Sequence, residues 1–491
     1  TIKAINFLAR ANMIFLEGKS FQFFYTEINF FIQKLSGIWI SARRYPYFNI
    51  MSDQSTENQS LSSRRSFVKK GAFGGAAAGL STLGVPLVSA AEKEPKSKYK
   101  VGVVGLGGRG AGAVANILEA DSDTVLWAVG DVVEKRMEKI EGISKKFSGR
   151  VDTEGGKREF VGFDAYQKVI DSGVDIVLLT TTPNFRPMQF EAAVAAGKHV
   201  FIEKPFALDI PGLHSVVETA KKAKAAGQSV LTGLVWRYTP HLMDMDKRLK
   251  DGVIGDVVNV SSSYCGGGRP NRMPDPKFKP PSMSDMEWAL RFWQNFLELS
   301  GDGVLEYHIH GIDRMAWFMG DQMPVRCYAN GANIDPVLGA NNWDSCNFRY
   351  EYSDGRTASF FGRQIKGTYA DSGDTILGTK GRAVAKGSNA FIEVDGKKIW
   401  EGKSGLGYKQ EHEIFMKHIR EGKVYNDVID YTANSHAIGM MGRSAAYTGQ
   451  LITDEQIMAS KDVLLKDVKN LTLETPFTAR ESAVPGKTKF L

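Results

Sequence analysis

Three polar residues in the second half of the chain have the types and the spacing needed to move a proton. Glu306, His310 and Asp313 lie four and three residues apart, so they share one face if residues 304–318 form a helix. Histidine, with an ordinary pKa of about 6.5, can take a proton from a hydroxyl near neutral pH. A single histidine on such a face is more often structural, but two neighbouring carboxylates favour a catalytic interpretation. His308 falls outside this face and receives no role.

A cluster of glycines after residue 104 has the pattern that binds the phosphates of a dinucleotide. An apolar run at 99–104 precedes the cluster, and a helix is expected from residue 111 to about 119. In this pattern Gly105 allows a tight turn, Gly107 lets the backbone approach a pyrophosphate, and Gly110 lets the helix pack on the strand. The helix N-terminus then faces the phosphate charge. The predicted cofactor-binding turn comprises Gly105, Leu106, Gly107, Gly108, Arg109 and Gly110.

An acidic residue at the end of the next strand bears on which dinucleotide binds. The β-rich run at 124–129 is followed by Gly130-Asp131, where a carboxylate can accept hydrogen bonds from the adenosine ribose. A carboxylate repels a 2′-phosphate, so Asp131 favours NAD over NADP. Lys135 and Arg136 could receive that phosphate if they turned inward, which keeps NADP possible. A solvated helix face is the favoured interpretation for both.

Apolar strands and helices alternate around these groups and must position them. Strands are predicted at 174–181, 199–202 and 229–235, with helices between them at 189–196 and 212–226. Repeated strand–helix units indicate an α/β fold of the Rossmann type, a doubly wound parallel sheet with helices on both faces. Ligands of such sheets bind beyond the carboxyl ends of the strands, where we place Thr181, Thr182, Pro183, Glu203 and Lys204.

These motifs together resemble the glucose–fructose oxidoreductase/inositol dehydrogenase/MocA family. The resemblance covers residues 98–475 and rests on the glycine turn, Thr182-Pro183, Glu203-Lys204-Pro205, Glu306-x-x-x-His310-x-x-Asp313, Gly378-Thr379-Lys380-Gly381 and Gln410-Glu411-His412-x-x-Phe415. It implies a nucleotide-binding domain at 98–235 and, at 236–491, an α/β domain with an open, mainly antiparallel sheet. Members of the family oxidise hydroxyls of sugars and cyclitols with NAD or NADP. The open sheet commonly makes a subunit contact, so a homodimer or homotetramer is expected.

The resemblance also implies catalytic roles. The residue matching His310 takes the hydroxyl proton, while Lys204 hydrogen-bonds the reacting oxygen and stabilises its developing charge. Glu306 would orient the base or tune Lys204, although inositol-dehydrogenase-like members carry Asp at this position. Many relatives carry His where this chain has Arg186, which we expect to bring a fixed positive charge near the cofactor or substrate entrance. No catalytic role is assigned to Arg186.

The substrate side of the site is less specific in the sequence. Aromatic rings and guanidinium groups suit a sugar or an acidic sugar, and several of them lie after the last predicted strand and before the catalytic helix. They suit an oligomer interface or an ordinary core equally well. The predicted substrate residues are Trp236, Arg237, Tyr264, Arg291, His310 and Asp313.

The positive charge of the chain lies at its beginning. Of 62 Lys and Arg and 55 Asp and Glu, residues 1–90 hold 10 and 4, so residues 91–491 carry a net charge of only +1. This balance argues against a nucleic-acid partner. The three cysteines are too scattered for a zinc cluster, and no metal site is expected. The apolar run at 21–40 contains Glu27 and Lys34, which argue against a membrane span.

The beginning of the chain also carries an export motif. Residues 63–69, Ser-Arg-Arg-Ser-Phe-Val-Lys, resemble a twin-arginine signal and precede an Ala/Gly-rich run and small residues at 88–90. We therefore expect a signal peptide at 51–90, a doubtful upstream segment at 1–50, and a periplasmic or otherwise exported bacterial protein.

Export shapes the functional expectation, because free nicotinamide nucleotides are not maintained outside the cytoplasm. We expect an NAD(P)-dependent oxidoreductase for sugars, sugar acids or cyclitols, with a tightly bound cofactor that is recycled in each turnover. A redox-neutral, NAD-dependent glycosidase is the alternative, and a non-catalytic sugar-binding protein is the second alternative.

Overall fold

The structure, a computed structural model, describes residues 97–490. The predicted upstream segment and signal peptide lie outside these residues. Within them, no helix combines the length and apolar character needed to cross a membrane.

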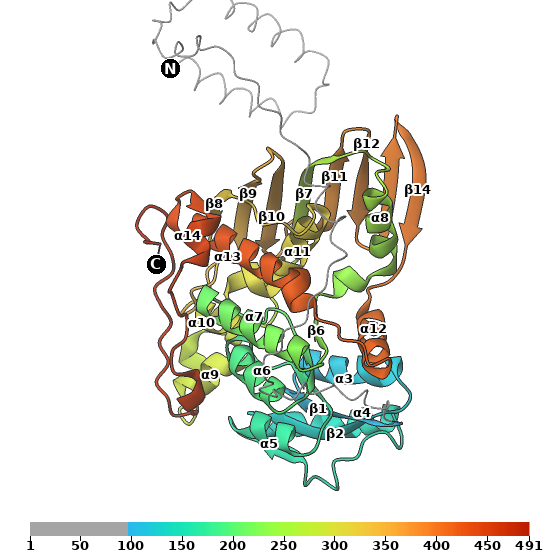
Figure 1. Cartoon of the computed structure of the whole chain (residues 1–491). Coiled ribbons are helices and arrows are strands. Elements are labelled where there is room, and N and C mark those ends of the chain that lie inside the picture. The colour runs from blue at the N-terminus through green and yellow to red at the C-terminus, as the bar shows by residue number, and fades with distance from the viewer. Residues whose placement is uncertain (1–96, 491) are drawn as a thin grey trace, which may run out of the picture. The chain divides into compact units, whose positions relative to one another are not determined.

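The first half of the described chain forms a parallel sheet of six strands (Figure 1). Its order is β3-β2-β1-β4-β5-β6, and every neighbouring pair is parallel. The central strands are buried on both faces, as their continuous apolar sequence requires. The predicted Rossmann-type sheet is confirmed, with strands β1 (Tyr99–Val104), β2 (Thr124–Asp131), β3 (Glu159–Val161), β4 (Ile176–Leu179), β5 (His199–Ile202) and β6 (Val230–Thr232).

Helices cover both faces of this sheet. Those that follow its strands are α3 (Gly108–Ala120), α4 (Lys139–Lys146), α5 (Ala165–Asp171), α6 (Arg186–Ala195) and α7 (Ile210–Ala225). A further helix, α12 (Tyr408–Arg420), comes from late in the chain and packs against α3. Phe415, Met416 and Ile419 of α12 share one apolar cluster with Val101 and Val114. The nucleotide-binding half therefore takes part of its core from beyond residue 236.

The second half forms a mainly antiparallel sheet of nine strands in the order β14-β13-β12-β11-β7-β10-β9-β8-β15, in which only β7 and β10 pair in parallel. This confirms the expected second sheet. The strands are β7 (Val257–Gly266), β8 (Arg326–Ala332), β9 (Ser345–Glu351), β10 (Thr357–Gln364), β11 (Asp371–Gly378), β12 (Gly381–Lys386), β13 (Asn389–Val394), β14 (Lys397–Lys403) and β15 (Ile452–Thr453).

Helices α11 (Ile309–Phe318) and α13 (Ala433–Thr448) pack on one face of this second sheet (Figure 1). The remaining α-helices of the described chain are short or lie at its margins: α8 (Pro240–Lys250), α9 (Asp285–Arg291), α10 (Leu297–Ser300) and α14 (Asp454–Met458). Short 3₁₀-helical turns lie in the loops between the helices and strands: η1 (Glu134–Glu138), η2 (Pro183–Phe185), η3 (Val235–Tyr238), η4 (Pro276–Phe278) and η5 (Trp293–Asn295). A further one, η8 (Val468–Asn470), follows α14.

The helix predicted at 304–318 is not continuous. Residues Val304–His308 form a π-helical turn, η6, and the α-helix α11 begins only at Ile309. A π turn contains an extra residue, so the side chains after it are rotated relative to those before it. Glu306 lies within this turn, whereas His310 and Asp313 both follow it on α11, so the single helical period predicted across residues 304–318 is interrupted between Glu306 and the other two. A second π turn, η7 (Val428–Thr432), precedes α13 in the same way.

Candidate active site

The glycine turn between β1 and α3 has the geometry of a phosphate-binding loop. Gly105 has a φ of +91°, and a Cβ there would lie 2.7 Å from the backbone of Thr180. A Cβ on Gly110 would lie 1.9 Å from the carbonyl oxygen of Gly105, so the helix could not pack this closely with any side chain. At Gly107, by contrast, the nearest atom is Arg136 Nη1 at 3.7 Å, which leaves the backbone accessible. The tight positions and the open position are those that a dinucleotide requires.

The N-terminus of α3 is suited to an anion. Its N-cap is Gly107, which has no side chain to satisfy the first N–H groups, and its first turn contains no acidic residue. These N–H groups, with the positive end of the helix dipole, favour a negatively charged ligand. The residues of the turn therefore fit the pyrophosphate of a dinucleotide, whose nicotinamide supplies hydride chemistry when it is bound.

The carboxylate of Asp131 organises this turn from the end of β2. Its Oδ2 accepts a hydrogen bond from the Leu106 N–H at 2.7 Å, and its Oδ1 accepts one from the Val133 N–H at 2.9 Å. Arg136 turns inward, with Nη1 3.2 Å from Asp131 Oδ2, and its side chain is only 33% exposed. The interpretation of Arg136 as part of a solvated face is thus wrong, whereas Lys135 is exposed. A guanidinium beside Asp131 would offer a partner to a 2′-phosphate at this position.

A pocket opens between the glycine turn and the loops that follow β2, β3 and β4. The lining combines polar groups that were predicted to bind the cofactor with apolar side chains from other segments of the chain. The main lining residues are Gly105, Asp131, Arg136, Phe163, Tyr166, Thr181, Thr182, Phe185, Gln189 and Leu290.

Arg186 holds the loop of Thr181 and the loop of Glu203 and Pro205 together through hydrogen bonds. It is 4% exposed, and its Nη1 donates to the carbonyl oxygens of Glu203 and Pro205 at 3.0 and 2.6 Å. Its Nη2 donates to the carbonyl of Thr181 at 2.5 Å. Burial lowers the pKa of Arg186 to about 10, so it stays charged at neutral pH. The expectation that Arg186 presents its charge at the site entrance is wrong, because the guanidinium is used internally.

Lys204 reaches across from the first half of the chain to η6. Its ammonium donates a hydrogen bond to the backbone carbonyl of Glu306, and Nζ lies 3.7 Å from Glu306 Oε2. The preceding Glu203 pairs with Arg109 of the glycine turn at 2.9 Å, and the Arg109 guanidinium lies 4.7 Å from the ring centre of Tyr408. The loop of Lys204 is thereby tied to both the cofactor turn and the second half of the molecule.

The carboxyl group of Glu306 is buried beside Lys204. Its Oε1 accepts a hydrogen bond from Gln294 Nε2 at 3.0 Å, while Oε2 has no hydrogen-bond partner within residues 97–490. Burial raises the pKa of Glu306, and the positive charge of Lys204 opposes that shift. Glu306 is thus placed to tune Lys204, one of the two roles expected for it.

His310 lies on α11 close to this pair. Burial, with the positive charges of Lys204 and Arg314, holds its pKa well below the ordinary value. The ring is therefore neutral near pH 7, and its Nδ1 has no hydrogen-bond partner among the described residues. The ring of Tyr264 lies 5.9 Å away, centre to centre. A neutral imidazole beside a lysine and a buried carboxyl group can accept a proton from a hydroxyl.

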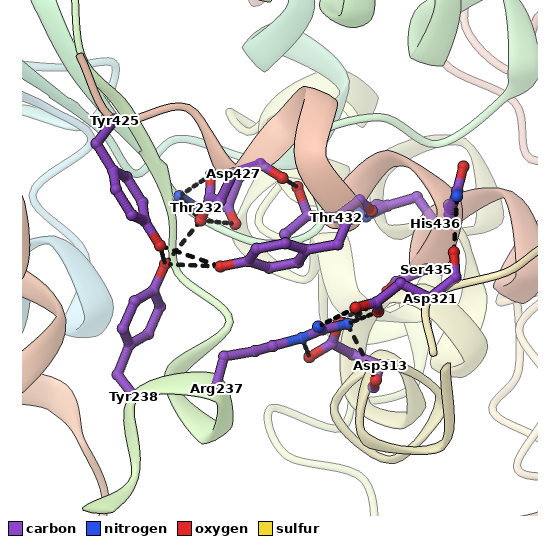
Figure 2. A network of polar contacts seen from close by, with 12 residues as sticks. Thr232, Arg237, Tyr238, Asp313, Asp321, Tyr425, Asp427, Thr432, Ser435 and His436 are labelled. Carbon is purple, nitrogen blue, oxygen red and sulfur yellow. Dashed lines mark hydrogen bonds and ion pairs between the residues drawn. The ribbon is translucent and has the colours of Figure 1, made fainter. Parts of the chain in front are cut away.

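Other predicted substrate residues are occupied elsewhere. Arg237 binds Asp313 through Nη2 and Oδ1 at 2.7 Å and also binds Asp321 at 2.6 Å (Figure 2). Both Arg237 and Asp313 are buried, so the substrate contacts predicted for them are contradicted by this internal ion pair. Arg291 is exposed and pairs with Glu287 one turn away on α9, which likewise argues against its predicted contact.

Trp236 and Tyr264 keep positions near the reactive groups. Trp236 is half-buried, and the guanidinium of Arg314 lies 4.6 Å from its ring centre. The loop after β6 that carries Trp236 is held by Asp427, which accepts hydrogen bonds from the Thr232 N–H at 2.9 Å and the Tyr238 hydroxyl at 2.8 Å (Figure 2).

Some neighbours of the site carry no signal in the sequence. Gln294 and Tyr408 come from separate segments, and no spacing relates them to His310 or Lys204. Arg314 lies one helical turn after His310 on α11, so the helical period could have indicated it. His308, which received no role, is buried with Nδ1 3.3 Å from the sulfur of Cys346. No group of three or more His, Cys, Asp or Glu within residues 97–490 could hold a metal ion.

Comparison with known proteins identifies two matching family models. Residues 99–230 match an oxidoreductase family with an NAD-binding Rossmann fold, GFO_IDH_MocA, and residues 242–384 match the GFO/IDH/MocA C-terminal domain. Among individual relatives, myo-inositol 2-dehydrogenase of Thermotoga maritima is 24% identical over 294 residues, which is 58% of this chain and 75% of that protein. A glycosyl hydrolase family 109 protein of Streptomyces coelicolor is 27% identical over 188 residues, 38% of this chain and 36% of that protein.

A solved structure shares the fold. Aldose–aldose oxidoreductase from Caulobacter crescentus superposes with a TM-score of 0.58 at 19% identity, covering 72% of this chain and 99% of that chain.

Proposed function

Because this chain belongs to the GFO/IDH/MocA oxidoreductase family, we propose that it oxidises a hydroxyl group of a sugar, sugar acid or cyclitol, with NAD as hydride acceptor. The observation that supports this proposal is the contact of Lys204, at the carboxyl end of the first sheet, with Glu306, which is followed on α11 by His310. The same family includes the inositol dehydrogenase relative named above.

The chemistry follows from the state of each group. Lys204 donates a hydrogen bond to the substrate hydroxyl oxygen and stabilises negative charge as it develops. Neutral His310 accepts the hydroxyl proton, and Glu306 holds the ammonium of Lys204 in place. Tyr264 and Trp236 offer aromatic surface to the apolar face of a ring substrate.

Replacement of the two reactive groups tests this assignment. We expect Lys204→Met and His310→Asn each to lower kcat by about 10²- to 10⁴-fold while nucleotide binding is retained. Lys198→Met is a matched control, because Lys198 binds the Val174 carbonyl away from the pocket. Undiminished turnover in both active-site variants would refute the roles.

A retained cofactor is the second part of the proposal. The export motif predicted at 63–69 would take the protein to a compartment without a supply of free nucleotide, so the cofactor must be loaded earlier and regenerated in place. We expect purified mature protein to contain nucleotide that mass spectrometry identifies as NAD or NADP. Protein that is free of nucleotide and active only with added NAD would contradict retention.

A redox-neutral glycosidase is the second candidate, and the similarity to the glycosyl hydrolase family 109 protein favours it. Oxidation next to a scissile bond, followed by reduction, would also return the cofactor to its starting state. A panel of glycosides separates the candidates: release of the aglycone without net NADH identifies the hydrolase. Sugar binding without any turnover would instead support a non-catalytic binding protein.

We also propose an exported homodimer or homotetramer that associates through the open face of the nine-stranded sheet. Tyr328 and Phe361 are 49% and 40% exposed in its strands. Light scattering of the mature protein tests the assembly, and replacement of Phe361 by Glu should dissociate it. Cell fractionation tests the location.

A further inference from the structure

One wall of the nucleotide pocket comes from outside the nucleotide-binding half. Among the residues that line the pocket in the described chain, Leu290 of α9 is separated from all the others by about a hundred residues of sequence. It is only 5% exposed and lies in one apolar cluster with Phe185. The helix α9 has seven residues, too few to be stable without tertiary contacts. Its position over the pocket must therefore be maintained by whatever packs behind it.

The segment behind α9 is the C-terminal strap, which we define as residues 464–480. Figure 1 shows the chain returning after α14 along the edge of the molecule toward α9. Leu471 of the strap is buried in the cluster that contains Leu290 and Met286. Other strap residues that pack on the same cluster are Leu465, Val468, Leu473 and Phe477. The strap therefore supplies the apolar support that α9 lacks in its own sequence.

Both ends of the strap are held by hydrogen bonds to carboxylate side chains. At the first end, the Leu464 N–H donates to Asp209 Oδ2 at 2.9 Å, and Asp209 caps α7 of the nucleotide-binding half. At the other end, the Arg480 N–H donates to Glu298 Oε1 at 2.7 Å. The Arg480 carbonyl also accepts a hydrogen bond from Asn341 Nδ2 at 3.1 Å. The strap thus spans the two halves of the molecule and is fixed in each.

We propose that the C-terminal strap holds α9 against the nucleotide pocket and thereby slows release of the bound dinucleotide. The inference rests on the proposed function, since it requires a dinucleotide in this pocket. The strap lies beyond both segments that match the family models, which end at residues 230 and 384. Its contribution is to keep Leu290 and Phe185 together as an apolar wall of the pocket in which a dinucleotide would be held.

The test is the rate at which NADH leaves the full-length mature protein, measured from its fluorescence after a chase with excess NAD. We expect Leu290→Ala and Leu471→Asp each to speed release by about tenfold or more, because each removes buried apolar contact from the wall or its support. Glu474→Ala is the matched control, because Glu474 lies on the same strap but is exposed. NADH should leave this variant at the same rate as it leaves the wild type.

Hydrogen exchange of the wild-type protein gives a second readout that needs no variant. If the strap and the cofactor stabilise one another, NAD must slow amide exchange in residues 285–291 and 465–477, since the coupling is reciprocal. Exchange there that is indifferent to NAD, or release rates that are the same in all variants, would overturn the role of the strap and leave the dehydrogenase proposal intact. A wild-type protein that binds neither NAD nor NADH would overturn both.

Discussion

Shortening Arg186 to lysine should loosen the loops of Thr181 and Lys204 together. The guanidinium makes three hydrogen bonds to backbone carbonyls, at 2.5, 2.6 and 3.0 Å. A lysine ammonium keeps the charge, but it cannot reach three carbonyls in the fork geometry of arginine. If two of the three bonds are lost, at about 1.5–3 kcal/mol for each bond to a charged group, Arg186→Lys costs roughly 3–6 kcal/mol of stability.

A catalytic effect should accompany the loss of stability, because Lys204 directly follows one of the released carbonyls. A displacement of about 1 Å in a positioning group can cost about 10²-fold in rate. We therefore expect kcat of Arg186→Lys to fall by about 10²-fold, with a smaller change in KM. The assays are urea unfolding and steady-state kinetics at saturating nucleotide. Arg382→Lys is the control, since Arg382 forms a half-exposed pair with Glu393 on the second sheet.

Unchanged stability and unchanged kcat in Arg186→Lys would refute this account of the two loops. Loss of stability with an unchanged kcat would show that Arg186 supports the fold without positioning Lys204.

Two further predictions concern charge. Arg136→Ala should weaken NADP binding by about tenfold more than NAD binding, because a 2′-phosphate gains most from a cation beside Asp131; equal losses in titrations with the two nucleotides would contradict this. Burial raises the pKa of Asp427 from an ordinary 3.8 to about 7, so between these pH values the folded state binds a proton that the unfolded state has lost. The stability that this proton contributes to the folded state is lost as the pH rises from about 4 to 7. Compared with Asp427→Asn, the wild type should lose up to about 3 kcal/mol between pH 5 and pH 8 in denaturant unfolding, and parallel pH profiles would argue against it.

Local patterns in the sequence were sufficient for the cofactor turn and for five strands of the first sheet, but the short edge strand β3 (Glu159–Val161) was not predicted. The spacing of Gly105, Gly107 and Gly110 reflects local packing: a side chain at Gly105 or Gly110 would clash with nearby atoms, whereas the space beside Gly107 is open. The strand ends at Thr181 and Lys204 follow from the topology of a parallel sheet. For these features, neighbours in sequence are also neighbours in space, so composition and periodicity carry the necessary information.

The catalytic helix shows where local patterns failed. A single α-helical period predicted one face for Glu306, His310 and Asp313, but the π turn at Val304–His308 changes the register. His310 and Asp313 both follow this turn on α11, and the side chain of Asp313 is occupied by its ion pair with Arg237, 76 residues away in the chain. No periodicity predicts a π turn, because its extra residue is stabilised by packing against distant elements.

The sequence by itself determined the kind of chemistry, through a nucleotide turn, a lysine at a strand end and a histidine between carboxylates. Only the tertiary structure decided which of these charged side chains face a ligand. The charges of Arg186, Arg237 and Asp313 are buried and paired with other groups of the protein, because a buried charge is stable only with such partners. The same structure placed Arg136 beside Asp131 and Leu290 over the nucleotide pocket, because those contacts join segments whose separation in sequence carries no regular signal.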